Sequence, residues 1–448
     1  MEELNIFEKY LALLENGKYL LLKEELNEDN PANVAEFFEE LDLSKQLFVF
    51  RFLTKDMAAE VFSYMDGDTQ ENIVKSITDS EIRNILAEMF LDDTVDFLSE
   101  MPADLVTKVL KNTDETKRKL INQFLNYPED SAGSLMTIEF VQFYMDMTVK
   151  AAMEQLKVTG IDKETIYNCY VVNEKRMLIG VLPLRELLFA SGDTLVKELM
   201  EDRVIKVTTL DDQEIVADIF KKYNFIALPV VDGDERLVGI ITVDDIVDVI
   251  EEENTEDFEK MAALIPAEEE YLKAGVFSLA KNRIIWLLVL MISGTISSLI
   301  ISNYESLISS VVMLAAFMPI LMDTGGNAGS QASTLIIRGM ALSEIEEKDI
   351  LKVIWKEIRV GLLTGLSLAV VNFIRLALFE SASVRINLTV SLSLIAVVVL
   401  AKVVGSILPM VAKKMKLDPA MMAGPLMTTV VDAMSLIIYF KIAQILIL

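Results

Sequence analysis

The chain has 448 residues and a net charge of −28, and it contains no histidine and a single cysteine, Cys169. This composition excludes Ser-His-Asp and Cys-His catalysis, thiolate zinc sites and a disulfide framework. A metal ion bound here must accept oxygen ligands, which favours Mg²⁺, Ca²⁺ or Mn²⁺. The charge is uneven, because residues 1–270 carry 59 acidic and 26 basic side chains whereas residues 271–448 carry 10 and 15. A surface this acidic attracts cations and repels nucleic acid, although a solvated charged face explains the same composition.

Residues 1–130 are predicted to form an acidic, all-α domain. Apolar pairs recur at helical spacing in "VAEFFEEL", "AAEVFSYM" and "VDFLSEM", and short polar breaks such as "DGDTQ" separate them. This pattern is typical of a stacked array of short helices. The first residues, "MEELNIFEKY", lack the apolar core of a signal peptide, so we expect this domain to lie in the cytosol.

An internal repeat follows the helical domain. The stretch "SLMTIEFVQFY…YVVNEKRMLIGVLPLRELL" is echoed by "ELMEDRVIKVT…LPVVDGDERLVGIITVDDIVDVI". Each copy predicts strand–helix–strand–strand–helix, with a turn at "NEKR" or "DGDE" between the last two strands. The repeat resembles a tandem α/β CBS pair, with a first module at 131–200 and a second at 201–250.

Nine acidic residues crowd the positions between 244 and 259 at the end of the second copy. Like charges four residues apart on a helix repel each other. The segment therefore predicts either a solvated, frayed helix or a divalent-ion sensor whose carboxylates converge on the ion. We place an acidic linker helix, acting as a plug, at 251–280, where it would carry the signal to the first membrane span.

Residues 281–448 predict an α-helical membrane domain with five spans, since each apolar stretch can cross about 30 Å of hydrocarbon. Basic residues precede the first span and fill the loops after the second and fourth. The positive-inside rule then places the N-terminus in the cytoplasm and the C-terminus outside the cell membrane. The predicted spans are 284–302, a segment starting near Leu307 and running into "DTGGNAGSQASTLIIRG", 360–379, 389–411 and 420–440.

Two glycine-containing segments are predicted to interrupt membrane helices. They are "MDTGGNAGSQ" in the second span and Gly424–Pro425 in the fifth. Broken helix at this depth is tolerated only where it is buried in protein or lines a wet cavity, and freed carbonyls there can coordinate cations. The alternative is close helix packing through small residues. The nearby carboxylate of Asp432 favours the pore.

Asp432 stands inside the apolar stretch "TTVVDAMSLIIYF", where a carboxylate costs about 2.5–3.5 kcal/mol on insertion scales. Gly424, Thr428 and Asp432 recur at every fourth residue and therefore share one helix face. A carbonyl, a hydroxyl and a carboxylate on one face suit a cation in a water-filled pathway. The alternative is a buried carboxylate bonded to a neighbouring helix.

The segments "GGNAGSQASTLIIRG" and "LDPAMMAGPLMTTVVD", behind a CBS pair and an acidic helical domain, resemble the MgtE family of magnesium channels and transporters. The resemblance covers essentially the whole chain. It implies a homodimer in the lipid bilayer with the pore between the subunits. It also implies import of Mg²⁺ down its electrochemical gradient, and closure of the pore when cytosolic Mg²⁺ is plentiful.

The resemblance also implies which residues carry these roles. Asp432 takes the place of the selectivity aspartate, and Asp418 lies at the cytoplasmic entrance. The pore candidates are Asp432, Thr428, Gly424, Asn327 and Asp418. The sensor candidates are Glu60, Asp92, Asp96, Asp245, Asp248, Glu253, Glu256 and Asp257. Two residues depart from the family's pattern: Ser435 replaces an expected glycine, and Asp323 precedes "TGGN".

Other functions stay open from the sequence alone. The "TVDD" segment gives Thr242 and Asp245 the spacing with which CBS pairs contact ribose, which makes ATP a weakly supported ligand. The alternatives to a channel are an exchanger coupling Na⁺ or H⁺ at Asp432 and a non-conducting nucleotide sensor in the membrane. The chain has no Walker-type phosphate loop, and without histidine or a thiol pair it is not expected to be an enzyme.

Overall fold

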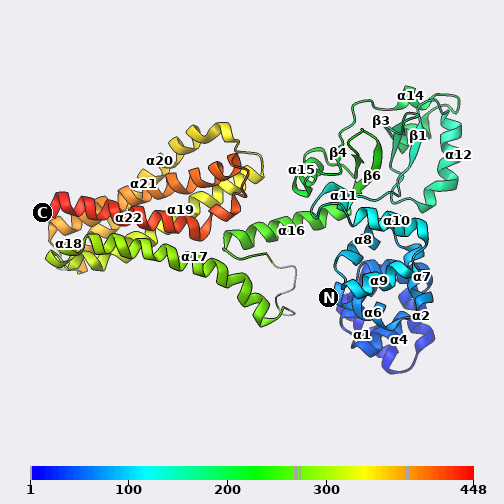
Figure 1. Cartoon of the computed structure of the whole chain (residues 1–448), viewed down its shortest axis with the longest axis horizontal. Helices are drawn as coiled ribbons and strands as arrows, with labels where there is room; N and C mark the ends of the chain where they lie inside the picture. Colours follow the sequence, from blue (N-terminus) through cyan, green and yellow to red (C-terminus); the bar gives the residue numbers. More distant parts are fainter. Residues whose placement is uncertain (1–2, 267–270, 272–273, 380–382, 448) are drawn as a thin grey trace. The chain divides into compact units, whose positions relative to one another are not determined.

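The computed structural model describes residues 3–266, 271, 274–379 and 383–447 (Figure 1). Contacts divide the chain into two compact units, Met1–Glu251 and Glu252–Leu448. Each unit is described by itself.

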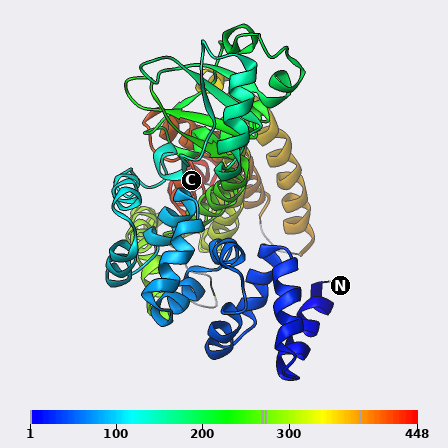
Figure 2. The same cartoon turned by 90° about the vertical axis from the view of Figure 1, so that its right-hand side faces the viewer.

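The first unit begins with a series of short helices, which confirms the predicted helical domain (blue to cyan in Figure 2). Asp42, Thr54 and Asp66 each accept a hydrogen bond from the backbone amide three residues on. These caps satisfy amides that have no partner within the helix, and so they fix where helices begin. The helices are α1 Glu3–Glu15, α2 Tyr19–Glu28, α3 Pro31–Glu39, α4 Leu43–Phe50, α5 Lys55–Ser63, α6 Gly67–Ser76, α7 Asp79–Glu88, α8 Leu91–Ser99, α9 Ala103–Asn112 and α10 Glu115–Phe124.

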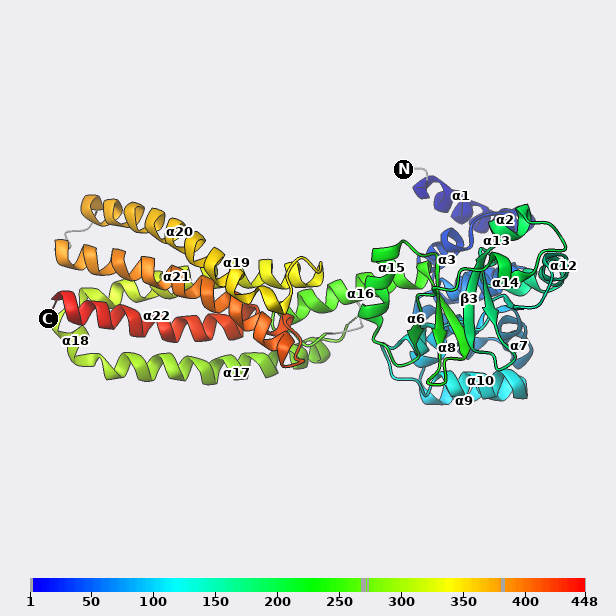
Figure 3. The same cartoon turned by 90° about the horizontal axis from the view of Figure 1, so that it is seen from above.

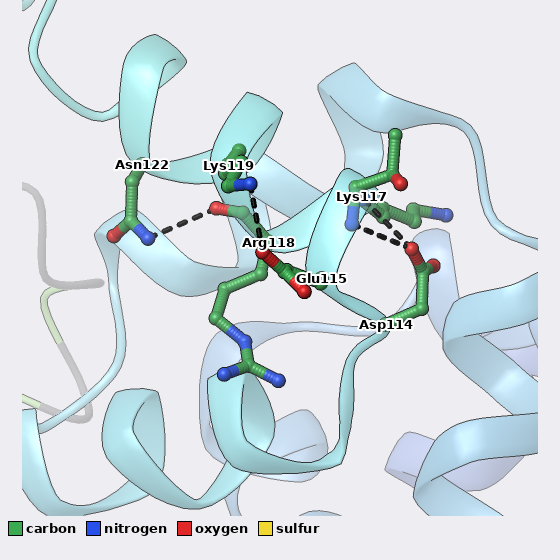
Figure 4. Close-up of polar contacts among 7 residues, drawn as sticks. Asp114, Glu115, Lys117, Arg118, Lys119 and Asn122 are labelled. Atoms are coloured by element: carbon green, nitrogen blue, oxygen red, sulfur yellow. Dashed lines mark hydrogen bonds and ion pairs between the residues drawn. The ribbon is translucent and has the colours of Figure 1, made fainter.

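The start of α10 ties this helix to the region that carries Asp92. The side chain of Asp114 caps α10 and accepts from the backbone amide of Lys117 at 3.0 Å (Figure 4). The ammonium of Lys117 leaves its own helix and donates to the carbonyl oxygen of Met89 at 2.7 Å. Because Met89 lies in the short connection between α7 and α8, two residues before α8 begins at Leu91, this bond holds α10 beside the start of α8.

The two CBS copies contain the predicted order of elements. In each three-stranded sheet, the first strand is parallel to the second and the second is antiparallel to the third. The predicted turns contain Arg176 and Glu235 at positive φ, 62° and 64°. The elements are α11 Ala132–Leu135, β1 Gln142–Tyr144, α12 Val149–Thr159, η1 Gly160–Asp162, β2 Asn168–Val172, β3 Leu178–Pro183, α13 Leu184–Phe189, α14 Val196–Leu199, β4 Val207–Thr208, α15 Gln213–Tyr223, β5 Ala227–Val231, β6 Leu237–Thr242 and α16 Val243–Met261.

The segment that opens each copy packs on the sheet of the other copy. A Cβ on Gly239 would lie 2.7 Å from the sulfur of Met136, and a Cβ on Gly180 would lie 2.6 Å from the sulfur of Met200. The repeated glycines thus leave room for the repeated methionines of the opposite copy. The two copies therefore fold as an interlocked pair rather than as separate modules.

The helix bounds differ from the linker helix predicted at 251–280. α16 begins at Val243, as the last element of the second CBS copy, and ends at Met261. Ala263 then takes a positive φ of 55°, which a continuing helix does not allow. Residues 267–270 and 272–273 of the predicted segment lie outside the described residues.

The second unit is a bundle of long helices, seen side by side in Figure 3. α21 packs along α19, α20 and α22. Within the described residues, α17, α20, α21 and α22 are long and apolar enough to cross a membrane. The predicted second span, α19, has sufficient length at 29 residues but carries glycines and polar residues from Asp323 onward. The elements are α17 Val276–Asn303, α18 Glu305–Ser310, α19 Met313–Ala341, η2 Glu347–Asp349, α20 Ile350–Phe379, α21 Val384–Lys414, η3 Ala420–Met422 and α22 Gly424–Ile447.

The predicted break in the second span is wrong, because α19 runs without interruption through Gly325, Gly326 and Gly329. In the fifth span the interruption lies directly before Gly424, where Ala423 separates the 3-10 turn η3 from α22. A Cβ on Gly405 would lie 2.3 Å from the carbonyl oxygen of Gly329, so α19 and α21 cross with their backbones in contact. Small residues permit this close approach of two helices. At this crossing the glycines therefore serve close packing.

Candidate functional site

Asp432 lies on the face of α22 that its spacing predicts. Because the helix begins at Gly424, the residues Gly424, Thr428 and Asp432 follow one another on successive turns. The hydroxyl of Thr428 donates to the carbonyl oxygen of Pro425 at 2.9 Å, which leaves its oxygen lone pairs able to accept. Asp432 is half-buried. This face therefore presents a carboxylate and a hydroxyl oxygen one turn apart.

A second polar stripe runs along α19 beside this face. Asp323 and Asn327 lie one turn apart, and both side chains are exposed within the unit. A Cβ on Gly326 would lie 3.4 Å from the methyl group of Thr428, which places this part of α19 against α22. The carboxylates of Asp323 and Asp432 are near enough to repel each other. The structure therefore brings the predicted Asn327 and the unexpected Asp323 to the helix pair that carries Asp432.

Exposed carboxylates and amides at membrane depth are costly against hydrocarbon and are found facing protein or water. By contrast, α17 exposes large apolar side chains such as Leu287, Met291 and Ile292, which suit a lipid environment. The stripes on α19 and α22 therefore mark the side of the bundle that faces away from lipid.

Acidic side chains gather around one lysine where the end of α16 meets the segment before α22. The ammonium of Lys260 lies 2.8 Å from an oxygen of Asp418 and 2.6 Å from an oxygen of Glu256. Burial, followed by repulsion from Asp418, raises the pKa of Asp257 to about 6. The structure thus assembles three predicted residues here. The sequence did not single out Lys260, although its position four residues after Glu256 was an available signal.

Gly424 has a packing role at the same place. A Cβ on Gly424 would lie 2.4 Å from the carbonyl oxygen of Met261, the last residue of α16. The side chain of Met261 packs against a cluster that includes Ile336 of α19, Val353 of α20 and Met410 of α21. Gly424 therefore allows the end of α16 to dock on the start of α22. Its place among the pore oxygens stays a prediction.

A second acidic group lies within the first unit, where α8 meets the CBS pair. Asp92 is buried, and among the described residues its Oδ1 atom has no hydrogen-bond partner. Burial, with repulsion from Asp93, Asp245 and Glu164, raises the pKa of Asp92 well above its usual value. Burial and neighbouring carboxylates raise the pKa of Asp93 to about 6 and that of Glu164 to about 7. The sequence did not single out Asp93 or Glu164, which become neighbours only through folding.

Asp245 belongs to this acidic group and to the predicted ribose contact. The hydroxyl of Thr242 donates to Oδ2 of Asp245 at 2.7 Å, across the junction of β6 and α16. Burial raises the pKa of Asp245 to about 6, although the bond from Thr242 opposes this shift. The hydrogen bond orients the carboxylate and leaves its second oxygen to accept from another partner.

Glu253 is half-buried and repels Asp257 of the group around Lys260. Glu60 on α5, Asp96 on α8 and Asp248 on α16 have exposed side chains. In the part of the chain that the structure describes, no three side chains of Asp, Glu or Cys lie close enough together to hold a metal ion. Their convergence on Mg²⁺ stays a prediction.

Three known protein families match successive parts of the chain. The divalent cation transporter family, MgtE, matches residues 318–442, and the MgtE intracellular N domain matches residues 29–130. The CBS domain family matches residues 132–193 and 196–252.

Two curated relatives and two solved structures are similar to this chain. The magnesium transporter MgtE of Thermus thermophilus is 37% identical over 438 residues, which cover 97% of this chain and 96% of the relative. The magnesium transporter MgtE of Bacillus subtilis is 33% identical over 435 residues, with coverages of 97% and 96%. The crystal structure of the soluble part of a magnesium transporter is 33% identical with a TM-score of 0.53, covering 56% of this chain and 99% of that chain. The cytosolic domain of the Mg²⁺ channel MgtE in complex with ATP is 38% identical with a TM-score of 0.52, covering 54% and 99%.

Proposed function

The chain belongs to the MgtE family of magnesium transporters, and from this premise we propose that it is a Mg²⁺ channel closed by cytosolic Mg²⁺. It is a multi-pass membrane protein with a cytosolic N-terminal domain. The observation that carries the proposal is Asp432, an acidic side chain within a membrane helix, beside a second polar stripe on α19.

The proposed pore forms between two copies of the chain. Two Asp432 carboxylates would supply two negative charges to a dication that keeps most of its water shell, since Mg²⁺ loses water reluctantly. Thr428 and Asn327 would accept hydrogen bonds from that shell, and Gly424 and Asp418 would lie toward the cytoplasmic mouth. An inside-negative potential favours entry of a dication by about 4.6 kcal/mol per 100 mV, from about 2.3 kcal/mol per charge. Import therefore needs no ATP-driven motor.

The acidic groups support closure by cytosolic Mg²⁺. Burial, together with repulsion from neighbouring carboxylates, raises the pKa values of Asp92, Asp93 and Asp245. The Lys117 ammonium opposes this shift at Asp93, but one cation does not balance several carboxylates at neutral pH. Divalent ions would supply the missing positive charge and hold the helical domain, the CBS pair and the linker helix together. The further carboxylates proposed to contribute are Glu60, Asp96, Asp248, Glu253, Glu256 and Asp257.

The end of α16 would transmit closure to the membrane helices. Met261 docks on Gly424, and Lys260 bridges Glu256 and Asp418 at the same place. Because Gly424 begins α22, a shift of α16 acts on the helix that carries Asp432. We place the C-terminus outside the cell, which follows from five spans and a cytosolic N-terminus.

We also propose that the CBS pair binds ATP. The support is the Thr242–Asp245 hydrogen bond in the expected ribose-contacting pattern, together with the related cytosolic domain solved in complex with ATP. Since Asp245 also belongs to the acidic group, ATP and Mg²⁺ would influence each other's binding.

The test is Mg²⁺ uptake into proteoliposomes that hold the full-length chain, measured with a luminal Mg²⁺ dye. We expect uptake by the wild type and loss of uptake in Asp432→Ala. Asp349→Ala is the control, because it removes the same charge at the start of α20, where Asp349 pairs with Lys352. Size-exclusion elution and thermal melting must match between the variants. Loading Mg²⁺ on the cytosolic side should close the wild-type channel.

Three results would overturn the proposal. Undiminished uptake in a folded Asp432→Ala variant would remove the aspartate from the pathway. Uptake that requires a Na⁺ or H⁺ gradient would indicate an exchanger. The absence of flux for every ion tested would indicate a membrane-bound nucleotide sensor.

A further inference from the structure

An open pocket lies beside the polar stripe of α19 in the membrane unit, and Asp432 is not among its lining residues. Its volume is about 500 Å³, and three helices wall it. One wall is the α19 stripe with Asp323, Asn327 and Gln331, the second is α20 with Thr364 and Ser367, and the third is α21. Apolar side chains such as Leu363, Leu368 and Val398 supply most of the remaining lining. Polar groups at membrane depth are stable only beside protein, water or an ion.

The wall formed by α21 carries a lysine at membrane depth. Lys402 lies twelve residues before the end of α21 at Lys414, a distance of about 18 Å along the helix axis. Its side chain is only 6% exposed and lines the cavity. Among the described residues Lys402 makes no hydrogen bond or ion pair, and its ammonium is not sealed from the pocket. A charged group at this depth needs water or an opposite charge beside it.

Asp323 provides the opposite charge on the facing wall. It lines the same cavity, and its carboxylate is near enough to Asp432 for the two to repel. Asp323 and Lys402 do not touch in the described structure, so the cavity separates them and both remain available to a visiting ion or its water shell. The cavity therefore holds one carboxylate and one ammonium and has no net charge.

Two uncharged hydroxyl groups of α20 also line the pocket. The hydroxyl of Ser367 donates to the carbonyl oxygen of Leu363 at 2.8 Å, and that of Thr364 donates to the carbonyl oxygen of Val360 at 2.9 Å. Each hydroxyl proton is thus used in a hydrogen bond within α20, and each hydroxyl oxygen can still accept a hydrogen bond or contact a cation. A volume of this size accommodates an ion with six water molecules, each of which occupies about 30 Å³ in the liquid.

Without the lysine, this arrangement would trap a dication. Asp323 and Asp432 in each subunit would give a dimer four carboxylates around one pathway, and opposite charges attract strongly in a low-dielectric site. Conduction requires binding that is favourable enough for entry and weak enough for exit. A fixed positive charge beside Asp323 would meet the second requirement.

We propose that this cavity is a second cation chamber of the transport pathway, in which the Lys402 ammonium balances Asp323 so that a hydrated divalent cation passes through rather than staying. The inference rests on the proposed function, because it assumes that Mg²⁺ crosses the bundle. It assigns Lys402 as the residue that sets the residence time of the ion, a role distinct from selection at Asp432.

The test measures initial Mg²⁺ uptake against external Mg²⁺ in proteoliposomes for four charge combinations. We expect Lys402→Met to lower the half-saturating Mg²⁺ concentration on the order of tenfold and to lower the maximal rate, because the ion is held longer. Asp323→Asn should raise the half-saturating concentration by a similar factor. The double variant, again neutral in the cavity, should return to within about twofold of wild type.

Lys402→Arg is the matched control, since it keeps the charge and should keep the wild-type half-saturation. Lys402→Gln serves as a second neutral variant if Lys402→Met folds poorly, as judged by melting and elution. The inference is overturned if both neutral variants transport with wild-type half-saturation, or if the double variant shows no compensation. A wild type that transports while these variants are unchanged rejects only this inference, whereas a wild type without uptake rejects the proposed function itself.

Discussion

The docking of α16 on α22 can be perturbed with a single methyl group, by the substitution Gly424→Ala. The added Cβ would lie 2.4 Å from the carbonyl oxygen of Met261, whereas ordinary contact begins at 3.4 Å. The obstacle is backbone rather than a flexible side-chain end, so α16 and α22 must separate by about 1 Å. The separation also strains the Lys260–Asp418 ion pair, which measures 2.8 Å.

The magnitude follows from the cost of overpacking. Forcing one methyl group into a filled site costs about 1–3 kcal/mol. If the cost applies to the docked state alone, the equilibrium between docked and undocked α16 shifts by about 5- to 150-fold toward undocked. We therefore expect the cytosolic Mg²⁺ concentration for half-closure to rise at least about fivefold, with uptake at low cytosolic Mg²⁺ preserved.

The assay is Mg²⁺ uptake into proteoliposomes over a series of cytosolic-side Mg²⁺ concentrations. Gly294→Ala in α17 is the matched control, because no atom lies within 4 Å of its Cβ position. Gly326→Ala is a stricter control, since its Cβ would meet only the Thr428 side chain, at ordinary contact distances of 3.4 and 3.8 Å. If a folded Gly424→Ala variant closes at the wild-type Mg²⁺ concentration, the docking of α16 does not transmit closure.

Two further predictions concern stability. The pKa values of Asp93 and Glu164, about 6 and about 7, lie above their unfolded values, so the folded chain binds more protons and loses stability as pH rises from about 4 to 7. With a chelator present, the melting temperature of the cytosolic domains should fall between pH 5 and pH 8. Added Mg²⁺ should raise this melting temperature more at pH 8 than at pH 5. A melting temperature that rises with pH would contradict this assignment. Gly405→Ala places a Cβ 2.3 Å from the carbonyl oxygen of Gly329 and should destabilise the bundle by about 1–3 kcal/mol, measured by thermal melting against Gly294→Ala. Equal melting of these two variants would mean that α19 and α21 separate without cost.

Periodicity and repetition were sufficient to predict the helical domain, the CBS pair and the long apolar helices. These features depend on local patterns, such as the caps at Asp42 and Thr54, which act within a few residues. The spacing of Gly424, Thr428 and Asp432 likewise fixed their common face once α22 was a helix, because the helical repeat determines which residues align.

The roles of the glycines and the lysines were decided only by tertiary structure. A glycine in a membrane helix allows either a break or a close approach, and only the backbone of Gly329 against Gly405 shows which one occurs. Lys260 and Lys402 are single basic residues whose importance depends on neighbours from other helices, Asp418 in one case and the walls of the cavity in the other. Sequence therefore determined which helices form and which faces are polar, whereas packing between helices decided which charges meet, because those distances join residues far apart along the chain.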